Sequence, residues 1–175
     1  MAREQPTINW GGKDWAKAFD AKAPGPKRRR TYQTAPVRPA PPAAVVESTL
    51  AAVGAPAGQR IICDWPPNIL SVNSRAHWSK SSKARKAYRR SCWALALAAK
   101  VKLPADGDIR VRLDMFPPEP NGNDDDNAQS RFKAGRDGIA EALKVDDARF
   151  RVEPRLHREH PIACMVFTIL EGGAA

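Results

Sequence analysis

The sequence has no long hydrophobic run and few cysteines. None of its stretches approaches the roughly 18 consecutive apolar residues of a membrane-spanning helix, and the N-terminus lacks the hydrophobic segment of a secretory signal. The cysteines, Cys63, Cys92 and Cys164, lie far apart and form no CxxC pair. We therefore expect buried free thiols in a reducing cytosol and no membrane association. Because no cysteine lies near His157 and His160, we expect no zinc site.

Acidic residues are also scarce. The 175 residues include 29 Lys or Arg but only 19 Asp or Glu, which gives a formal net charge of +10 and a pI of about 10.0. This excess of positive charge favours polyanionic partners, most often nucleic acid. The length allows one ordinary domain and a tail.

Large apolar side chains are few in residues 1–57. Prolines recur through this segment with alanine and glycine between them, among them Pro24, Pro26, Pro36, Pro39, Pro41, Pro42 and Pro56. Such a segment cannot bury enough apolar surface to offset the loss of chain entropy. We therefore predict a disordered tail at 1–57 and a folded domain at 58–175.

Two features of this tail have functional interpretations. Trp10, Trp15 and Phe19 are at near-helical spacing and could dock another protein, although the composition favours a solvated tail. The run Lys27–Arg30 could grip phosphates or act as a nuclear signal, but solvated charge runs give the same pattern.

The pattern from residue 60 onward predicts four strands and two helices. The strands are expected at 61–65, 109–115, 150–156 and 162–170, and the helices at 82–100 and from the acidic run at 124 to 143. The strand at 162–170 is almost continuously apolar, which is typical of a central position. The order β-α-β-α-β-β indicates an α/β (α+β) domain, in which a single mixed sheet of about four strands is covered by two main helices. The second helix has an apolar face of Ala128, Phe132, Gly135, Ile139 and Leu143.

Acids gather in two short patches, Asp124-Asp125-Asp126-Asn127 and Asp146-Asp147. Clustered carboxylates repel one another, so they normally need a cation or a raised pKa to coexist, and their hard oxygens suit Mg²⁺ or Mn²⁺. If Asp124 is extended, it and Asp126 face the same way and could share a metal with Asp146 or Asp147. Helix capping alone explains the first patch but not the second. An EF-hand fails, because Asp126 and Phe132 occupy the positions that need Gly and Glu.

A polar stripe follows the first patch along the second helix. At 100° per residue, Lys133 and Asp137 both fall within about 20° of Asp126, opposite the apolar face. A lysine beside a metal carboxylate can hold a scissile phosphate and stabilise charge in the transition state. An ordinary surface salt-bridge stripe has the same spacing.

The segment from Arg75 to Lys102 contains nine Lys or Arg residues and no acid. His77, Trp78 and Tyr88 are interleaved with these cations, which suits phosphate neutralisation combined with stacking on an exposed base. The alternative is a solvated helix face with Trp78 in the core. The residues that we predict to bind DNA are Arg75, His77, Trp78, Lys80, Lys83, Lys86, Arg89 and Arg90.

These patterns resemble the RusA family of Holliday junction resolvases, which are small homodimeric, Mg²⁺-dependent DNA endonucleases often carried by prophages. The acidic signature of that family is roughly Asp-x-Asp-Asn, a helix with Lys and Asp four apart, and then Asp-Asp. Here it is matched by 124–127, Lys133 with Asp137, and 146–147, while 65–67 and 73–78 match the early Pro-Pro and Asn elements. The resemblance spans about residues 60–170. Lys133 lies farther from Asp126 than in the compact bacterial members, and the tail has no counterpart.

The resemblance implies metal ligands at Asp124, Asp126 and Asp147, with Asp146 as the alternative to Asp147, and Lys133 as the catalytic lysine. It further implies bound Mg²⁺ or Mn²⁺, a homodimer acting on four-way DNA junctions, and the cytoplasm of a bacterial or phage-infected cell. A function of another class remains open on the residues alone: a non-catalytic DNA- or RNA-binding module whose acids only cap a helix.

Overall fold

The computed structural model describes residues 41–120 and 124–170 of the protein. The predicted docking segment at 10–19 and the basic run at 27–30 lie outside the described residues. The helices are α2 (Ala43–Ala52), α3 (Trp78–Ala99) and α4 (Asp125–Leu143), with short 3-10 turns η1 (Asn68–Leu70) and η2 (Asp147–Arg149). The strands are β1 (Gln59–Asp64), β2 (Ile109–Phe116), β3 (Phe150–Leu156) and β4 (Cys164–Ile169). No described helix has the length and apolar character that a membrane crossing requires.

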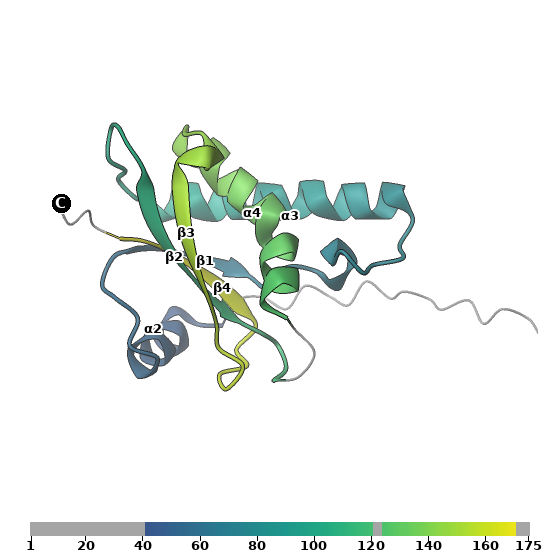
Figure 1. Ribbon diagram of the computed structural model, residues 1–175, viewed down its shortest axis with the longest axis horizontal. Coiled ribbons are helices and arrows are strands. Elements are labelled where there is room, and N and C mark those ends of the chain that lie inside the picture. Colours follow the sequence, from purple (N-terminus) through teal and green to yellow (C-terminus); the bar gives the residue numbers. More distant parts are fainter. Residues whose placement is uncertain (1–40, 121–123, 171–175) are drawn as a thin grey trace, which may run out of the picture. The chain divides into compact units, whose positions relative to one another are not determined.

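The four strands form one mixed sheet in the order β1-β4-β2-β3, which confirms the predicted fold class (Figure 1). Strand β4 pairs antiparallel with both β1 and β2, and all six of its residues are buried, as expected for a central strand. Strands β2 and β3 are parallel. This pairing is possible because α4 connects them and returns the chain to the edge of the sheet at which β2 begins.

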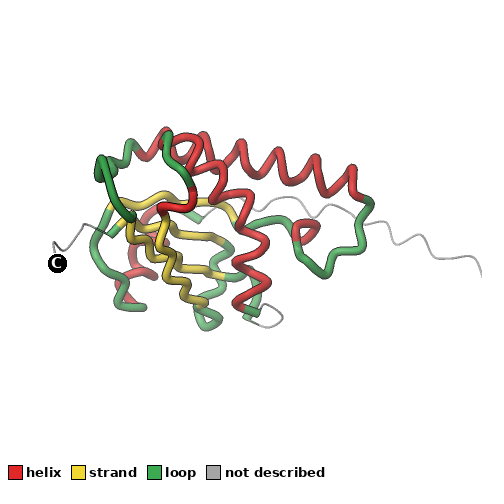
Figure 2. The backbone as a smooth tube through the Cα atoms, turned by 45° about the horizontal axis from the view of Figure 1, so that its top comes forward, coloured by secondary structure: helices red, strands yellow, loops and turns green. Residues whose placement is uncertain are grey.

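The alternation of residues in β2 gives the sheet two different faces. Val111, Leu113 and Met115 point into the main core, which also contains buried residues of α3 and α4. The two long helices lie together on this face (Figure 2). The opposite face carries a smaller apolar cluster, in which Phe116 packs with residues of β4 and α2. The two long helices, with the predicted site residues that they carry, therefore lie on the face of the sheet that contains the main core.

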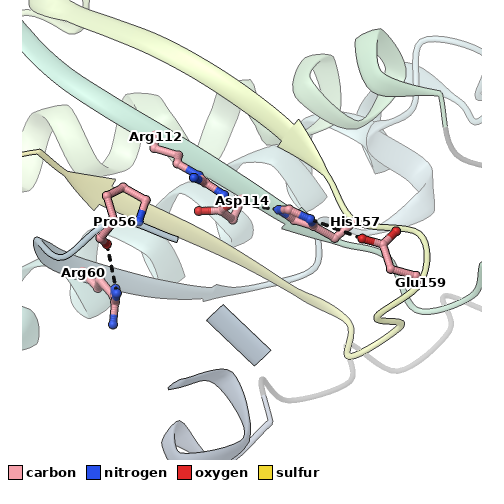
Figure 3. A network of polar contacts seen from close by, with 6 residues as sticks. All are labelled: Pro56, Arg60, Arg112, Asp114, His157 and Glu159. Atoms are coloured by element: carbon pink, nitrogen blue, oxygen red, sulfur yellow. Dashed lines mark hydrogen bonds and ion pairs between the residues drawn. The ribbon is translucent and has the colours of Figure 1, made fainter. Parts of the chain in front are cut away.

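A buried polar network occupies the second face of the sheet (Figure 3). The Asp114 side chain is fully buried, and its Oδ1 atom accepts a hydrogen bond from Arg112 Nε at 2.9 Å and is 2.8 Å from His157 Nε2. The His157 ring also stacks on Phe116, with 4.8 Å between ring centroids. Burial of a charge requires partners of this kind. The network accounts for His157 as a structural residue, on the face of the sheet that does not carry α4.

Helix α2 corrects the predicted boundary of the domain. Residues 43–52 were assigned to a disordered tail, but Val46 and Leu50 are fully buried and pack against Phe116, Cys164 and Val166. An ion pair between Glu47 and Arg60 also joins α2 to β1. The prediction was wrong because it weighed the high content of alanine and proline. Two large apolar residues four apart are enough to bury one face of a short helix. The element order is therefore α-β-α-β-α-β-β.

Shortening Leu50 should destabilise the whole domain. We expect Leu50→Ala to lower the free energy of unfolding by about 2–5 kcal/mol, because it opens a cavity between α2 and the sheet. Val45→Ala on the same helix is the control, since Val45 is exposed and should change stability by less than about 0.5 kcal/mol. Urea denaturation of both variants measures the difference. Equal effects would mean that α2 does not pack on the domain in solution.

Two glycines allow α4 to cross α3 at short range. A Cβ atom at Gly138 would overlap the backbone carbonyl oxygen of Arg89. A Cβ atom at Gly135 would meet the Phe132 ring at 2.8 Å and Cys92 Sγ at 3.0 Å. Gly138 thus sets the distance between the helix that carries the acidic stripe and the helix that carries the predicted DNA-binding cations.

Gly138→Ala should be more destabilising than Gly135→Ala, although alanine favours helices at both positions. Side chains beside Gly135 can rotate, whereas the Arg89 carbonyl can move only if α3 moves with it. Overpacking of this kind costs about 1–3 kcal/mol or more. Thermal unfolding of the two variants is the measurement. A Gly138→Ala protein as stable as the parent would show that the helices cross less closely than described.

Candidate functional site

The first acidic patch forms the N-terminus of α4, as predicted. Asp124 is the N-cap residue with an extended backbone (φ −90°, ψ 150°), and Asp125 and Asp126 occupy the first helical turn. All three are exposed. The Asp124 side chain makes no capping hydrogen bond. The positive end of the helix dipole offsets part of the repulsion among these carboxylates, and their oxygens face solvent.

The two carboxylates of the second acidic patch, Asp146 and Asp147, make different contacts. Asp146 caps η2 by accepting a hydrogen bond from the Ala148 amide at 2.9 Å. Asp147 forms an ion pair with Arg136 of α4, with Oδ2 and Nη2 3.1 Å apart. Arg136 is a residue that the sequence analysis missed. The ion pair therefore holds Asp147 against α4, whereas Asp146 stabilises the turn η2 to which it is adjacent.

The two acidic patches do not converge on one point. Arg136, which holds Asp147, lies ten residues after Asp126, and this corresponds to about 15 Å along the helix axis. Across residues 41–120 and 124–170, no three Asp, Glu, His or Cys side chains are close enough together to ligate a metal. The donor chemistry at Asp124 and Asp126 suits Mg²⁺, but the full ligand set that the resemblance implies is not assembled here.

One member of the polar stripe of α4, Lys133, borders a hollow of about 230 Å³ between the helix and the sheet. Lys133 lines this hollow together with Gln129, Ser130 and Arg136 from the same helix. Lys133 forms no ion pair with Asp126 or Asp137, the other members of the predicted stripe, within the described residues. The salt-bridge interpretation of the stripe is therefore not supported for Lys133, whose ammonium group remains available to an anion.

The loop between β1 and α3 is fastened to the N-terminal half of α4. Ser71 Oγ donates a hydrogen bond to Asn127 Oδ1 at 2.9 Å. Arg131 is buried, donates to the Pro66 carbonyl at 2.9 Å and to Asn68, and lies 5.6 Å from the centre of the Trp65 ring. Burial lowers the pKa of the Arg131 guanidinium, because desolvation disfavours the charged form. These hydrogen bonds attach the loop that contains the Pro-Pro element to the helix that begins with the acidic run.

The predicted DNA-binding residues fall into two groups. Arg75, His77, Trp78 and Lys80 lie at or before the start of α3, where the Trp78 side chain is 75% exposed. The core alternative for Trp78 is therefore wrong. His77 Nδ1 also accepts a hydrogen bond from the Ser79 amide at 3.3 Å, so this residue caps α3.

The second group faces α4. Lys86, Arg89 and Arg90 line a hollow of about 340 Å³ with Trp93 and Glu141, and Arg89 pairs with Glu141 at 2.9 Å. Lys83 is exposed one turn earlier on α3. Trp93 was missed, although its spacing of seven from Lys86 places it on the same helix face.

Tyr88 is not available for base stacking. Its ring is buried in the main core, and its hydroxyl donates a hydrogen bond to the Asp64 carbonyl at 2.7 Å. Burial raises the pKa of Tyr88 well above its usual value. Trp78 and Trp93 are the aromatic residues of α3 that a nucleic acid can reach.

No family model matches the chain. Over 117 residues it is 38% identical to an uncharacterized protein of Xylella fastidiosa (strain Temecula1 / ATCC 700964), and the match covers 65% of this chain and 76% of the Xylella protein. The chain belongs to the same protein family as that Xylella protein. This membership assigns no activity to the chain.

Proposed function

We propose that the protein is a Mg²⁺-dependent, structure-selective DNA endonuclease that resolves four-way junctions. The observation that carries the proposal is the packing of two helices with complementary roles. α3 presents exposed cations, and α4, which packs against it, presents exposed carboxylates at its N-terminus and Lys133 about two turns further along. Cations that neutralise phosphates beside acids that can bind a divalent metal are what phosphodiester cleavage requires. The resemblance to RusA resolvases supports the same assignment.

Each part of the site has a proposed role. Asp124 and Asp126 would hold Mg²⁺, or Mn²⁺ in its place, with Asp146 and Asp147 as the further candidates for its ligands. The bound metal would activate a water molecule and stabilise the leaving 3′-oxygen. Lys133 would hold the scissile phosphate and stabilise the charge that develops on it.

The basic residues of α3 and of the loop before it would grip the DNA backbone, with an exposed base stacking on a tryptophan. A four-way junction has two symmetry-related strands to cut. A homodimer with two-fold symmetry matches this substrate. The proposed setting is the cytoplasm of a bacterial or phage-infected cell.

One observation favours a second candidate function, a non-catalytic DNA- or RNA-binding module. No three acidic side chains converge in the described parts of the chain, and a binding module needs no such convergence. In that case the acids at the start of α4 would only complement the helix dipole.

A labelled synthetic junction separates the two functions. We expect the protein to nick it in Mg²⁺ or Mn²⁺ and not in EDTA, and to cut a linear duplex of the same length much more slowly. Binding to the junction without cleavage in either metal would refute the nuclease and favour the binding module. Equal cleavage of the linear duplex would refute selectivity for branched DNA.

A further inference from the structure

Arg136 has an arrangement that neither its sequence position nor the proposed ligand set explains. Arg136 of α4 lines the hollow beside the sheet, and one terminal nitrogen of its guanidinium pairs with Asp147. Its Nε atom is buried and makes no hydrogen bond to any described residue. A buried donor without a partner is costly, so the ion pair with Asp147 is the contact among the described residues that holds the Arg136 guanidinium in place.

The hollow has the chemistry of an anion site. Lys133 and Arg136 supply two positive charges, and Gln129 and Ser130 supply neutral hydrogen-bond donors from the same side of α4. Its floor is apolar and is formed by sheet residues that include Leu113 and Phe167. The volume of about 230 Å³ is several times the roughly 30 Å³ that a water molecule occupies, so a phosphate group can enter.

We infer that this hollow binds a backbone phosphate of DNA through Lys133 and Arg136, and that Asp147 is the positioning residue that orients the Arg136 guanidinium. The inference rests on the proposed function for the identity of the ligand. Guanidinium groups bind phosphate through paired donors in a fixed plane, so their orientation matters. An ion pair on one terminal nitrogen leaves the other terminal nitrogen of Arg136 free to face the hollow.

The orienting role of Asp147 and its alternatives predict different changes in DNA affinity when Asp147 is removed. If Asp147 only adds negative charge, its removal should tighten binding to DNA, because a repulsion is lost. If Asp147 only ligates a metal, its removal should leave binding in EDTA unchanged or slightly tighter, because no metal is bound there. If Asp147 orients Arg136, its removal should weaken binding in EDTA, even though the protein becomes more positive.

The test is a binding titration of a four-way junction in EDTA, where neither cleavage nor metal contributes. Arg136→Gln should weaken binding about tenfold and lower the slope of log K against log salt by about 0.9, as expected for one lost phosphate contact. Asp147→Ala should weaken binding several-fold. The double variant should be no weaker than Arg136→Gln alone, because Asp147 acts through Arg136.

Matched variants control for charge and for folding. Asp146→Ala removes the same charge one residue away without touching Arg136, and it should bind equally or more tightly. Arg151→Gln breaks another Arg–Asp ion pair, the more exposed one with Asp108, and should leave affinity within about twofold. Thermal unfolding checks that every variant is folded. Unchanged affinity of Arg136→Gln, or tighter binding by Asp147→Ala, would overturn the inference.

Two further measurements separate this inference from the nuclease proposal. A titration with Mn²⁺ in the absence of DNA should give the same affinity for Asp147→Ala as for the parent, and a large loss would return Asp147 to the metal ligands. Inorganic phosphate at matched ionic strength should compete only weakly. Strong competition would identify a small-anion site in place of a DNA subsite. If the parent never cuts DNA but the Arg136 effects are observed, the nuclease proposal fails and the phosphate site stands.

Discussion

Asp126→Asn is expected to abolish cleavage of a four-way junction and to leave binding intact or tighter. Asp126 lies in the first turn of α4 with its carboxylate in solvent, so the substitution removes a charge without disturbing the core. Loss of a ligand charge weakens binding of a divalent metal, while phosphate is repelled less. We expect the single-turnover cleavage rate to fall by about a hundredfold or more, since changing residues that only support metal ligands already costs about 10–100-fold.

Asp125→Asn is the matched control for this result. Asp125 is adjacent, equally exposed and of the same charge, but it is rotated by about 100° from Asp126 on the helix. It should bind the junction as tightly as Asp126→Asn does and cut at close to the parental rate. If Asp126→Asn cuts like the parent, the acids at the start of α4 only complement the helix dipole and the metal assignment is wrong.

The regular elements of the domain could be predicted because each has a clear local signal. The alternation of Val111, Leu113 and Met115 with polar residues predicts a strand with one face in the core, and the structure places them there. The predicted apolar face of α4 is also confirmed, since Ala128, Phe132, Gly135 and Ile139 are buried and Leu143 packs against the core. In both cases the period of the pattern equals the period of the element.

The errors arise where the deciding contact is distant in the sequence. Helix α2 depends on two side chains that meet Phe116 and β4 more than sixty residues later. Nothing local distinguishes Arg136 from other surface cations, because its role depends on Asp147 in the turn after the helix.

The failure of the acids to converge has a similar origin. The sequence places Asp146 and Asp147 just after the helix but does not show which side chains they meet. Asp147 pairs with Arg136, which lies ten residues after Asp126, or about 15 Å along the helix axis.

Substitutions in the basic residues of α3 and at Lys133 should distinguish an effect on DNA affinity from an effect on the cleavage rate. Changing Lys83, Lys86 and Arg90 together to Ala should weaken junction binding strongly and lower the slope of log K against log salt by about 2.7, or 0.9 per phosphate contact. Turnover at saturating DNA should change much less. The three side chains are exposed on a helix other than the one that carries Asp126, and they bind the ground state and the transition state alike.

Lys133→Ala should show the reverse pattern. Lys133 borders the hollow on α4, so its loss should lower the single-turnover cleavage rate at saturating DNA by about 10²–10³ and the affinity by no more than the roughly tenfold of one lost phosphate contact. Lys144→Ala is the control, because it removes an exposed cation from the C-terminal end of the same helix, away from the hollow. Binding titrations at several salt concentrations, paired with single-turnover cleavage, compare the two. If Lys133→Ala cuts normally at saturation, Lys133 contributes only to ground-state binding, and the transition-state charge must be stabilised by other groups.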